Sequence, residues 1–237
     1  MKSSVKFVLT GIAATIAVTN LNAQITLDTG DTDIGIGYED AWDLHVHKEE
    51  APNAGEYEPD EVFLQINANA LTTVPAGSQW SFLGNAGDPV WVLPQIENPN
   101  LLFLGLATEE IADGIFLNNE VTLSLRGVSG PGYFSVYTVS LGTPTVLMNS
   151  EDGISAGGSI VLPTGTHQHF NYGFTAPGSY TVSFEASGTL VAGSQFTQSG
   201  SVDYSFVVVP EPSTAALTGV GMGALLLAMR RRNQTRH

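Results

Sequence analysis

Four histidines in two closely spaced pairs are the residues of this chain whose types and spacing best suit chemistry. One residue separates the members of each pair, which are His45 with His47 and His167 with His169. On an extended strand, residues i and i+2 project from the same face, so each pair would present two imidazoles about 6 to 7 Å apart. That spacing suits a shared metal ion, and imidazole ligands favour divalent Zn, Cu, Ni, Mn or Fe.

Acidic residues flank the first pair and add oxygen atoms to the potential ligand set. Asp43 precedes His45 by two residues, and Glu49 follows His47 by two. If the two histidine-bearing strands are neighbours, their imidazoles converge on one ion, with carboxylates completing or orienting the site. We therefore predict a transition-metal site formed by His45, His47, His167 and His169, with Asp43 and Glu49 as additional ligands. The alternative is that each pair belongs to an ordinary polar strand face.

Other chemistries find less support in the sequence. The chain has no cysteine, which excludes thiol nucleophiles and thiolate metal sites. The acidic segment 28–35 is similar to a calcium loop but lacks its closing glutamate, so an acidic turn is the alternative. A partial cupin motif, in which His167 stands one residue too early, makes a divergent cupin-type enzyme a minor alternative; its residues are Gly157, Pro163, Gly165, His167 and Asn171. We expect no enzymatic activity.

Charge is segregated along the chain. Of the eight basic residues, only Lys48 and Arg126 lie outside the first six and last eight positions, whereas all 23 acidic residues fall between Asp28 and Glu211. Such a surface repels nucleic acid and anionic lipid head groups and attracts cations. We therefore expect no nucleic-acid partner. Without disulfides, an exported domain must rely on its apolar core, on a metal ion, or on both.

The elements that would position the histidines are strands. Apolar and polar residues alternate with period 2, and Gly, Pro, Asn and Asp clusters separate the alternating runs. This pattern predicts one antiparallel β-sandwich, Ig-like or jelly-roll-like, over residues 24–208. Only Ala107–Ala112 suggests a helical turn. The predicted strands are Ile34–Tyr38, Trp42–His47, Val62–Asn67, Val121–Arg126, Tyr133–Ser140, Ser159–Leu162, His167–Phe174, Tyr180–Ala186 and Val202–Val208.

The N-terminal segment has the features of a secretory signal peptide. Lys2 and Lys6 form a basic region, a mostly apolar stretch follows at 7–18, and the small residue Ala23 suits cleavage. Residues 1–23 are therefore predicted to direct export through Sec-type machinery.

The C-terminal segment 209–237 has the features of a sorting signal. Pro210, Glu211 and Pro212 precede an uncharged apolar run, which predicts a short transmembrane helix at 213–229; the run is followed by Arg230, Arg231 and Arg232. This order resembles the PEP-CTERM signal of Gram-negative envelope proteins, which implies processing by a membrane exosortase-like enzyme. An ordinary C-terminal membrane anchor is the alternative. Either interpretation places the bulk of the chain outside the cytoplasm, in the envelope, on the outer surface or in the extracellular matrix.

Sequence blocks across nearly the whole exported part resemble the choice-of-anchor M domain. They include DIGIGYED at 33–40, WDLHVH at 42–47, YEPDEV at 57–62, GDPVWVLPQ at 87–95 and PTGTHQH at 163–169. This family consists of surface-anchored proteins that pair one exported domain with alternative anchors. The resemblance implies a metal-handling or ligand-capturing role, because actinobacterial relatives accompany ABC transporters of the metal-uptake type. It implies no enzymatic activity.

Two functions from different classes follow. The first is a non-enzymatic envelope domain that binds a transition metal, or a metal-containing ligand, through the paired histidines, with a metal-uptake or envelope protein as its partner. The second is a structural or adhesive surface module, associated with exopolysaccharide, in which the histidines have no role in binding.

Overall fold

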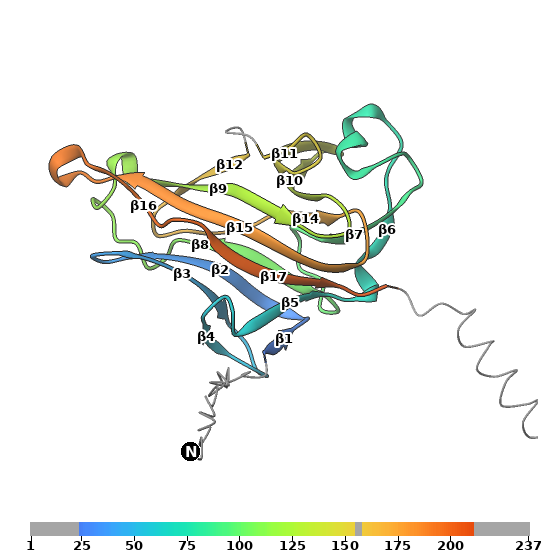
Figure 1. Cartoon of the computed structure of the whole chain (residues 1–237), viewed down its shortest axis with the longest axis horizontal. Helices are drawn as coiled ribbons and strands as arrows, with labels where there is room; N and C mark the ends of the chain where they lie inside the picture. Colours follow the sequence, from blue (N-terminus) through green and yellow to red (C-terminus); the bar gives the residue numbers. More distant parts are fainter. Residues whose placement is uncertain (1–23, 155–157, 211–237) are drawn as a thin grey trace, which may run out of the picture.

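The computed structural model describes residues 24–154 and 158–210 and shows an all-β, sandwich-like protein (Figure 1). The predicted signal peptide, the sorting signal and its helix at 213–229 lie outside the described residues. In the part of the chain that the structure describes, no helix is both long enough and apolar enough to cross a membrane.

The largest sheet, sheet A, has seven strands and forms one side of the apolar core. Its order is β1 (Ile25–Leu27), β5 (Val62–Ile66), β17 (Val202–Val208), β15 (Gly178–Thr189), β9 (Glu120–Ser129) and β12 (Ser159–Pro163), with β16 (Phe196–Gln198) also paired to β15. The long strand β15 pairs with β9 and β17 along most of its length.

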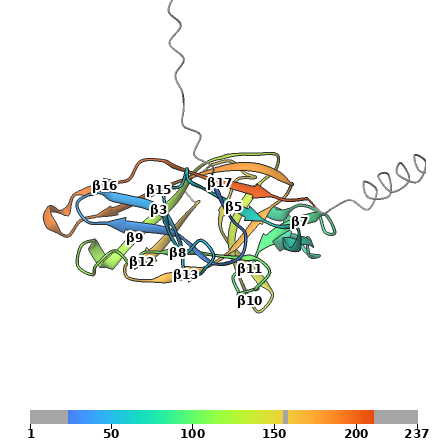
Figure 2. The ribbon, with the colours of Figure 1, turned by 90° about the horizontal axis from the view of Figure 1, so that it is seen from below.

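Two five-stranded sheets complete the fold. Sheet B has the order β13 (His167–His169), β8 (Leu102–Ala107), β2 (Gly30–Tyr38), β3 (Trp42–Lys48) and β4 (Gly55–Tyr57). Sheet C has the order β11 (Thr143–Asn149), β10 (Phe134–Ser140), β14 (Asn171–Phe174), β7 (Pro89–Leu93) and β6 (Leu71–Thr73). Only Phe170 separates β13 from β14, so one extended segment passes from sheet B into sheet C. In the view from below, β8 and β13 lie next to each other (Figure 2).

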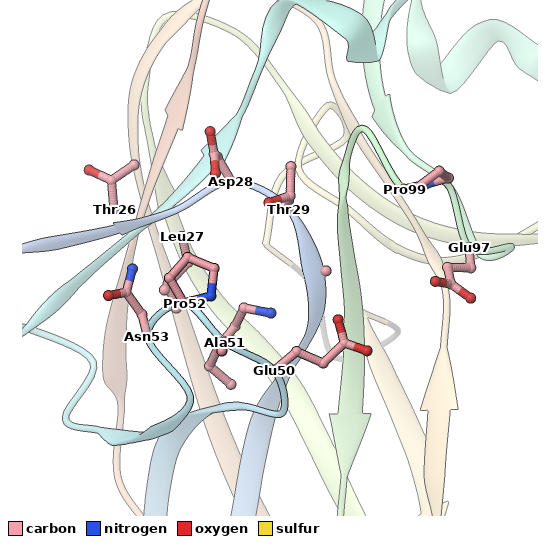
Figure 3. Close-up of a pocket in the computed structure, with 12 residues that line it drawn as sticks. Thr26, Leu27, Asp28, Thr29, Glu50, Ala51, Pro52, Asn53, Glu97 and Pro99 are labelled. Carbon is pink, nitrogen blue, oxygen red and sulfur yellow. The ribbon is translucent and has the colours of Figure 1, made fainter.

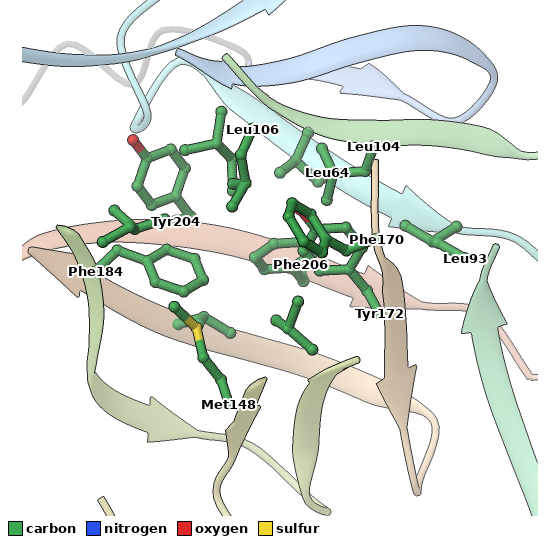
Figure 4. Close-up of a cluster of buried hydrophobic side chains, with 14 of the residues drawn as sticks. Leu64, Leu93, Leu104, Leu106, Met148, Phe170, Tyr172, Phe184, Tyr204 and Phe206 are labelled. Atoms are coloured by element: carbon green, nitrogen blue, oxygen red, sulfur yellow. The ribbon is translucent and has the colours of Figure 1, made fainter. Parts of the chain in front are cut away.

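One apolar core joins side chains from all three sheets (Figure 4). Leu104 and Leu106 of sheet B, Tyr172 of sheet C, and Phe184 and Phe206 of sheet A are all buried in it. Four short 3-10 helices lie in the connections: η1 (Ala68–Ala70), η2 (Ser78–Leu83), η3 (Leu117–Asn119) and η4 (Ala192–Ser194).

The structure confirms the all-β prediction, but some strands and their pairing differ from the prediction. Eight of the nine predicted strands form within a few residues at their ends, whereas the ninth, His167–Phe174, is divided at Phe170 into β13 of sheet B and β14 of sheet C. The segment Ala107–Ala112 ends β8 and continues as a turn rather than a helix. The sheets are mixed and not purely antiparallel, because β5 pairs in parallel with β1 and β17, and β2 with β8. Parallel partners need a long crossover connection, and each of these pairs is far apart in sequence.

Alternating side-chain directions along β2 and β8 give sheet B an apolar inner face and a polar outer face. Ile34 and Ile36 of β2 are buried in the apolar core, so their neighbours Asp33 and Gly35 project from the opposite face of sheet B. Leu104 and Leu106 of β8 are likewise buried in the core, so Phe103, Gly105 and Ala107 lie on the same outer face. The outer face of sheet B can therefore carry polar side chains while the inner face packs against sheet A.

Candidate metal centre

All four predicted histidines lie on the outer face of sheet B, but the two pairs are on different strands that are not neighbours. Strands β2 and β8 lie between β3 and β13. The backbones of the two histidine-bearing strands are therefore about 14 Å apart, at about 4.8 Å per strand spacing. Two rows of residues cross the sheet in register. They are His47, Asp33, Gly105 and His169 in one row, and His45, Gly35, Ala107 and His167 in the next.

The second histidine pair meets two carboxylates from β2. Ligand atoms of Asp31, Asp33, His167 and His169, called the Asp33 cluster below, all lie within 4.8 Å of one another. His167 Nε2 is 2.9 Å from Asp33 Oδ1, and His169 Nε2 is 3.7 Å from Asp31 Oδ1. The two imidazole rings are also close, with centroids 4.5 Å apart. Four potential ligands thus converge over strand β8.

Strand β8 makes this convergence sterically possible. Gly105 lies between β2 and β13, and a Cβ atom on it would overlap Asp33 Oδ1 and crowd His167 Nε2. A glycine inside a strand often marks such a close approach. Next to it, the ring of Phe103 stacks on His169, with ring centroids 3.4 Å apart and planes 11° apart, and so fixes the imidazole orientation.

The Asp33 cluster contains buried polar atoms that lack hydrogen bonds. Asp33 is fully buried, and within the described structure neither of its carboxylate oxygens has a hydrogen-bond partner. The same is true of Asp31 Oδ1 and His167 Nε2, because the short approach of His167 to Asp33 lacks hydrogen-bond geometry. Buried polar atoms are normally paired, and leaving them unpaired is costly. A single cation in contact with these atoms could satisfy several of them at once.

Proton affinities in the cluster reflect this burial. Burial raises the pKa of Asp33 from 3.8 to about 7; nearby His167 lowers it, whereas Asp31 and Glu49 raise it further. Burial also lowers the pKa of His169, although the carboxylate of Asp31 acts in the opposite direction. Near neutral pH, Asp33 in the metal-free cluster therefore retains part of its proton, which it would have to release to bind a cation, whereas the lowered pKa of His169 favours the neutral imidazole that can act as a ligand.

The spacing and chemistry of the cluster suit a four-coordinate divalent ion. Bonds of about 2.0 to 2.1 Å in a tetrahedral zinc site place neighbouring ligand atoms about 3.3 Å apart. The separations of 2.9 Å between His167 and Asp33 and of 3.7 Å between His169 and Asp31 lie on either side of this value. Two imidazole nitrogens and two carboxylate oxygens are ligands that zinc and related divalent metals accept. The cluster could therefore hold a metal ion.

The first histidine pair has different partners. His45 lies within 3.8 Å of carboxylate oxygens from Asp43, Glu56 and Glu110. His47 lies apart from this group and faces Glu49, with His47 Nδ1 and Glu49 Oε1 3.3 Å apart. Both predicted acids thus lie beside their expected histidines. The histidines nevertheless divide between separate groups, so the predicted single ion shared by all four imidazoles does not match the structure.

Several residues of these groups were missed by the sequence analysis. Asp31 and Asp33 were interpreted as parts of a loop, whereas residues 30–38 form strand β2, which makes the calcium-loop interpretation wrong. The signal was available, because two aspartates at i and i+2 on a strand project from one face. Glu56 and Glu110 had no such signal. A cupin-type centre would need His167 next to His45 and His47 around one ion, which this strand order does not provide.

A separate acidic cavity of about 180 Å³ lies near the start of β2 (Figure 3). Its carboxylates come from Asp28, Glu50 and Glu97, and its described lining contains no imidazole. Lys48 lines the cavity, is itself buried, and donates a hydrogen bond from Nζ to the backbone oxygen of Asp31, 3.1 Å away. A cationic side chain already occupies this part of the acidic surface, so the Asp33 cluster is the better metal candidate.

Comparison of the chain with protein-family models, with curated proteins and with solved structures finds no match.

Proposed function

We propose that this protein is a non-enzymatic envelope domain that binds a divalent transition metal through Asp31, Asp33, His167 and His169. The observation that carries the proposal is the convergence of two imidazoles and two carboxylates whose buried atoms have no hydrogen-bond partners in the described structure. A cation would satisfy these atoms together, whereas a single proton can satisfy only one or two of them. Zn²⁺ is the ion that we expect to fit best, and Mn²⁺, Fe²⁺, Ni²⁺ and Cu²⁺ are related candidates.

The ligand count supports binding rather than catalysis. Catalytic zinc sites generally keep three protein ligands and one open position, whereas closed sites use four. The Asp33 cluster offers four side chains whose ligand atoms lie within 4.8 Å of one another. Its partial exposure at Asp31, His167 and His169 would still let an ion reach it from solvent.

The cellular context of this proposal comes from the sequence. The signal peptide and the PEP-CTERM-like tail support export and surface sorting, with the Sec machinery and an exosortase-like enzyme as processing partners. The acidic surface would attract cations. The resemblance to choice-of-anchor M proteins supports metal handling together with an envelope partner. Mass spectrometry of the mature protein should detect no peptide after residue 214, and recovery of an intact C-terminus would favour a permanent anchor instead.

Metal-dependent stability tests the proposal directly. The purified protein is stripped with a chelator and melted with and without Zn²⁺. An ion that binds only the folded state stabilises it by about 2.7 kcal/mol at a hundredfold excess over Kd. We expect His167→Ala to remove most of this stabilisation, whereas the matched control His47→Ala should retain it, because His47 lies outside both groups that could hold an ion. If none of Zn²⁺, Mn²⁺, Fe²⁺, Ni²⁺ and Cu²⁺ shifts the melting temperature, the alternative of a structural or adhesive module is favoured.

A further inference from the structure

A second group of ligands lies on the same face of sheet B, centred on His45. His45 Nε2 is 3.4 Å from Glu56 Oε1 and 3.5 Å from Glu110 Oε1, and His45 Nδ1 is 3.8 Å from Asp43 Oδ2. We call these four residues the His45 cluster. They come from β3, from β4 and from the turn after β8, so the group is assembled by tertiary structure and not by one acidic segment.

The imidazole at its centre is buried and lacks a hydrogen-bond partner. The His45 side chain is only 6% exposed, and within the described structure its Nδ1 atom has no hydrogen-bond partner. The ring is thus buried between carboxylates while its Nδ1 atom is unpaired, an arrangement that is rare for buried polar atoms. This is a separate observation from the gathering of acidic residues, and it points to a ligand for the ring.

Two glycines of β2 shape the floor beneath this ring. Gly35 lies directly below His45, and a Cβ atom there would overlap the imidazole. At Gly37, a Cβ atom would lie 2.8 Å from Glu110 Oε2 and 3.5 Å from Asp43 Cβ. The absence of side chains on β2 therefore allows the ring and the carboxylates to approach one another.

A cavity of about 220 Å³ gives access to the group. His45, His47 and Glu110 line it, together with Gly35 and Ala107 on its floor. Ala107 is the register partner of His167, so the small-residue floor extends from the His45 cluster toward the Asp33 cluster. A hydrated ion could therefore approach both clusters from the same side of the sheet.

We propose that the His45 cluster is a second, weaker divalent-cation site, with His45, Glu110 and Asp43 as its ligands and Glu56 beside them. The ligand set of one nitrogen and several carboxylate oxygens favours divalent ions that accept oxygen ligands readily, such as Mn²⁺ and Zn²⁺. Its carboxylates are 51 to 64% exposed, so water competes with the ion and screens its attraction. This inference does not depend on occupancy of the Asp33 cluster.

Calorimetric titration of the chelator-stripped full chain with Zn²⁺ tests the second site. We expect two ions per chain, bound in two phases that differ at least tenfold in Kd. His45→Ala should remove the weaker phase and leave the tighter one, and His167→Ala should do the reverse. His47→Ala, a loss of histidine on the same face, should leave both phases in place. Glu110→Gln and Gly35→Ala repeat the test without removing the buried ring, should His45→Ala fail to fold by circular dichroism.

The outcomes separate this inference from the proposed function. One ion per wild-type chain, with binding unaffected by His45→Ala and Glu110→Gln, would overturn the second site while leaving the Asp33 cluster intact. Loss of the tighter phase in His45→Ala would also overturn it as a separate, weaker site. A weaker phase that depends on His45, in a protein whose tighter phase is missing, would support the second site and contradict the proposed function.

Discussion

The Asp33 cluster and the His45 cluster are built from the same kinds of side chain, but the protein has removed them from water to different extents. Asp33 is fully buried, whereas the carboxylates around His45 are 51 to 64% exposed. Burial strengthens the interaction of a carboxylate with a cation, and it also fixes the side chain before the ion arrives. We therefore expect burial of the acid, more than the number of ligands, to make the Asp33 cluster the tighter of the two proposed sites.

In the metal-free protein, both clusters contain a carboxyl group whose ionisation is unfavourable. Burial raises the pKa of Asp33 to about 7, and burial together with neighbouring acids raises the pKa of Glu110 as well. At Asp33 the chain retains a carboxyl group that is unfavourable when charged and unpaired. Such a residue is disfavoured by stability alone, which is consistent with a role in binding a cation.

The largest expected effect is the loss of the buried carboxylate. Asp33→Asn keeps the shape of the side chain but removes its negative charge, so we expect Zn²⁺ affinity at the Asp33 cluster to fall about a hundredfold or more. Glu110→Gln should weaken the His45 cluster only about tenfold, because water already competes there. Competition with a chromophoric chelator measures both. Equal effects of the two substitutions would contradict the comparison.

Alanine at Gly105 or at Gly35 should weaken one cluster at a time without removing any ligand. Gly105→Ala should push Asp33 and His167 apart, and Gly35→Ala should displace the ring of His45. Because poor positioning of metal ligands typically costs 10- to 100-fold in affinity, we expect each substitution to weaken one site by about that factor. Calorimetry should show that the other site is unchanged. If both sites weaken in either variant, general distortion of sheet B is the better explanation.

A smaller effect is expected from the aromatic ring that supports His169. Phe103→Leu keeps an apolar side chain but removes the flat surface on which the imidazole stacks. Because this ring orients a ligand without being one, we expect a several-fold to about tenfold loss of Zn²⁺ affinity at the Asp33 cluster. Phe196→Leu, at an exposed position on sheet A, is the matched control and should have no effect. An unchanged affinity in Phe103→Leu would mean that β13 alone orients His169.

The smallest expected effect is a pH dependence of the metal-free protein. Because the folded-state pKa of Asp33 is about 7, the folded chain binds a proton more tightly than the unfolded chain, and Asp33 therefore destabilises the fold as pH rises from about 4 to 7. We compare the wild type with Asp33→Asn. His169, whose pKa is lowered by burial, affects the pH dependence of stability in the opposite direction, but it is present in both of these proteins. The melting temperature of wild type minus that of Asp33→Asn should thus fall by a few degrees between pH 5 and pH 7.5.

Zn²⁺ provides the control for this pH effect. Bound metal favours the deprotonated carboxylate, so saturating Zn²⁺ should abolish or reverse the fall in that temperature difference. A difference that is independent of pH in the metal-free protein would show that Asp33 is ionised throughout this range and has a compensating partner.

Much of the fold could be predicted from the sequence, because a strand's face is a local property. The alternation around His45 and His167 correctly placed each pair on one face of a strand, and Asp43 and Glu49 were found beside their histidines. Strand β8 was not predicted, because the prediction depended on local alternation of polar and apolar residues and β8 has none. Its sequence, LFLGLA, is apolar without alternation, which is typical of a strand buried on both faces and cannot be told from a helix segment by period alone.

The sequence by itself determined that the chain is all-β, strongly acidic and free of cysteine, and that it presents its histidines in pairs. Tertiary structure decided which strands are neighbours. Strands β2 and β8 lie between the two pairs, so His167 and His169 meet Asp31 and Asp33 instead of the other histidines. Period 2 specifies a face but not a neighbour, because neighbours are set by long-range pairing, such as the parallel pairing of β2 with β8, and by the packing of one shared core.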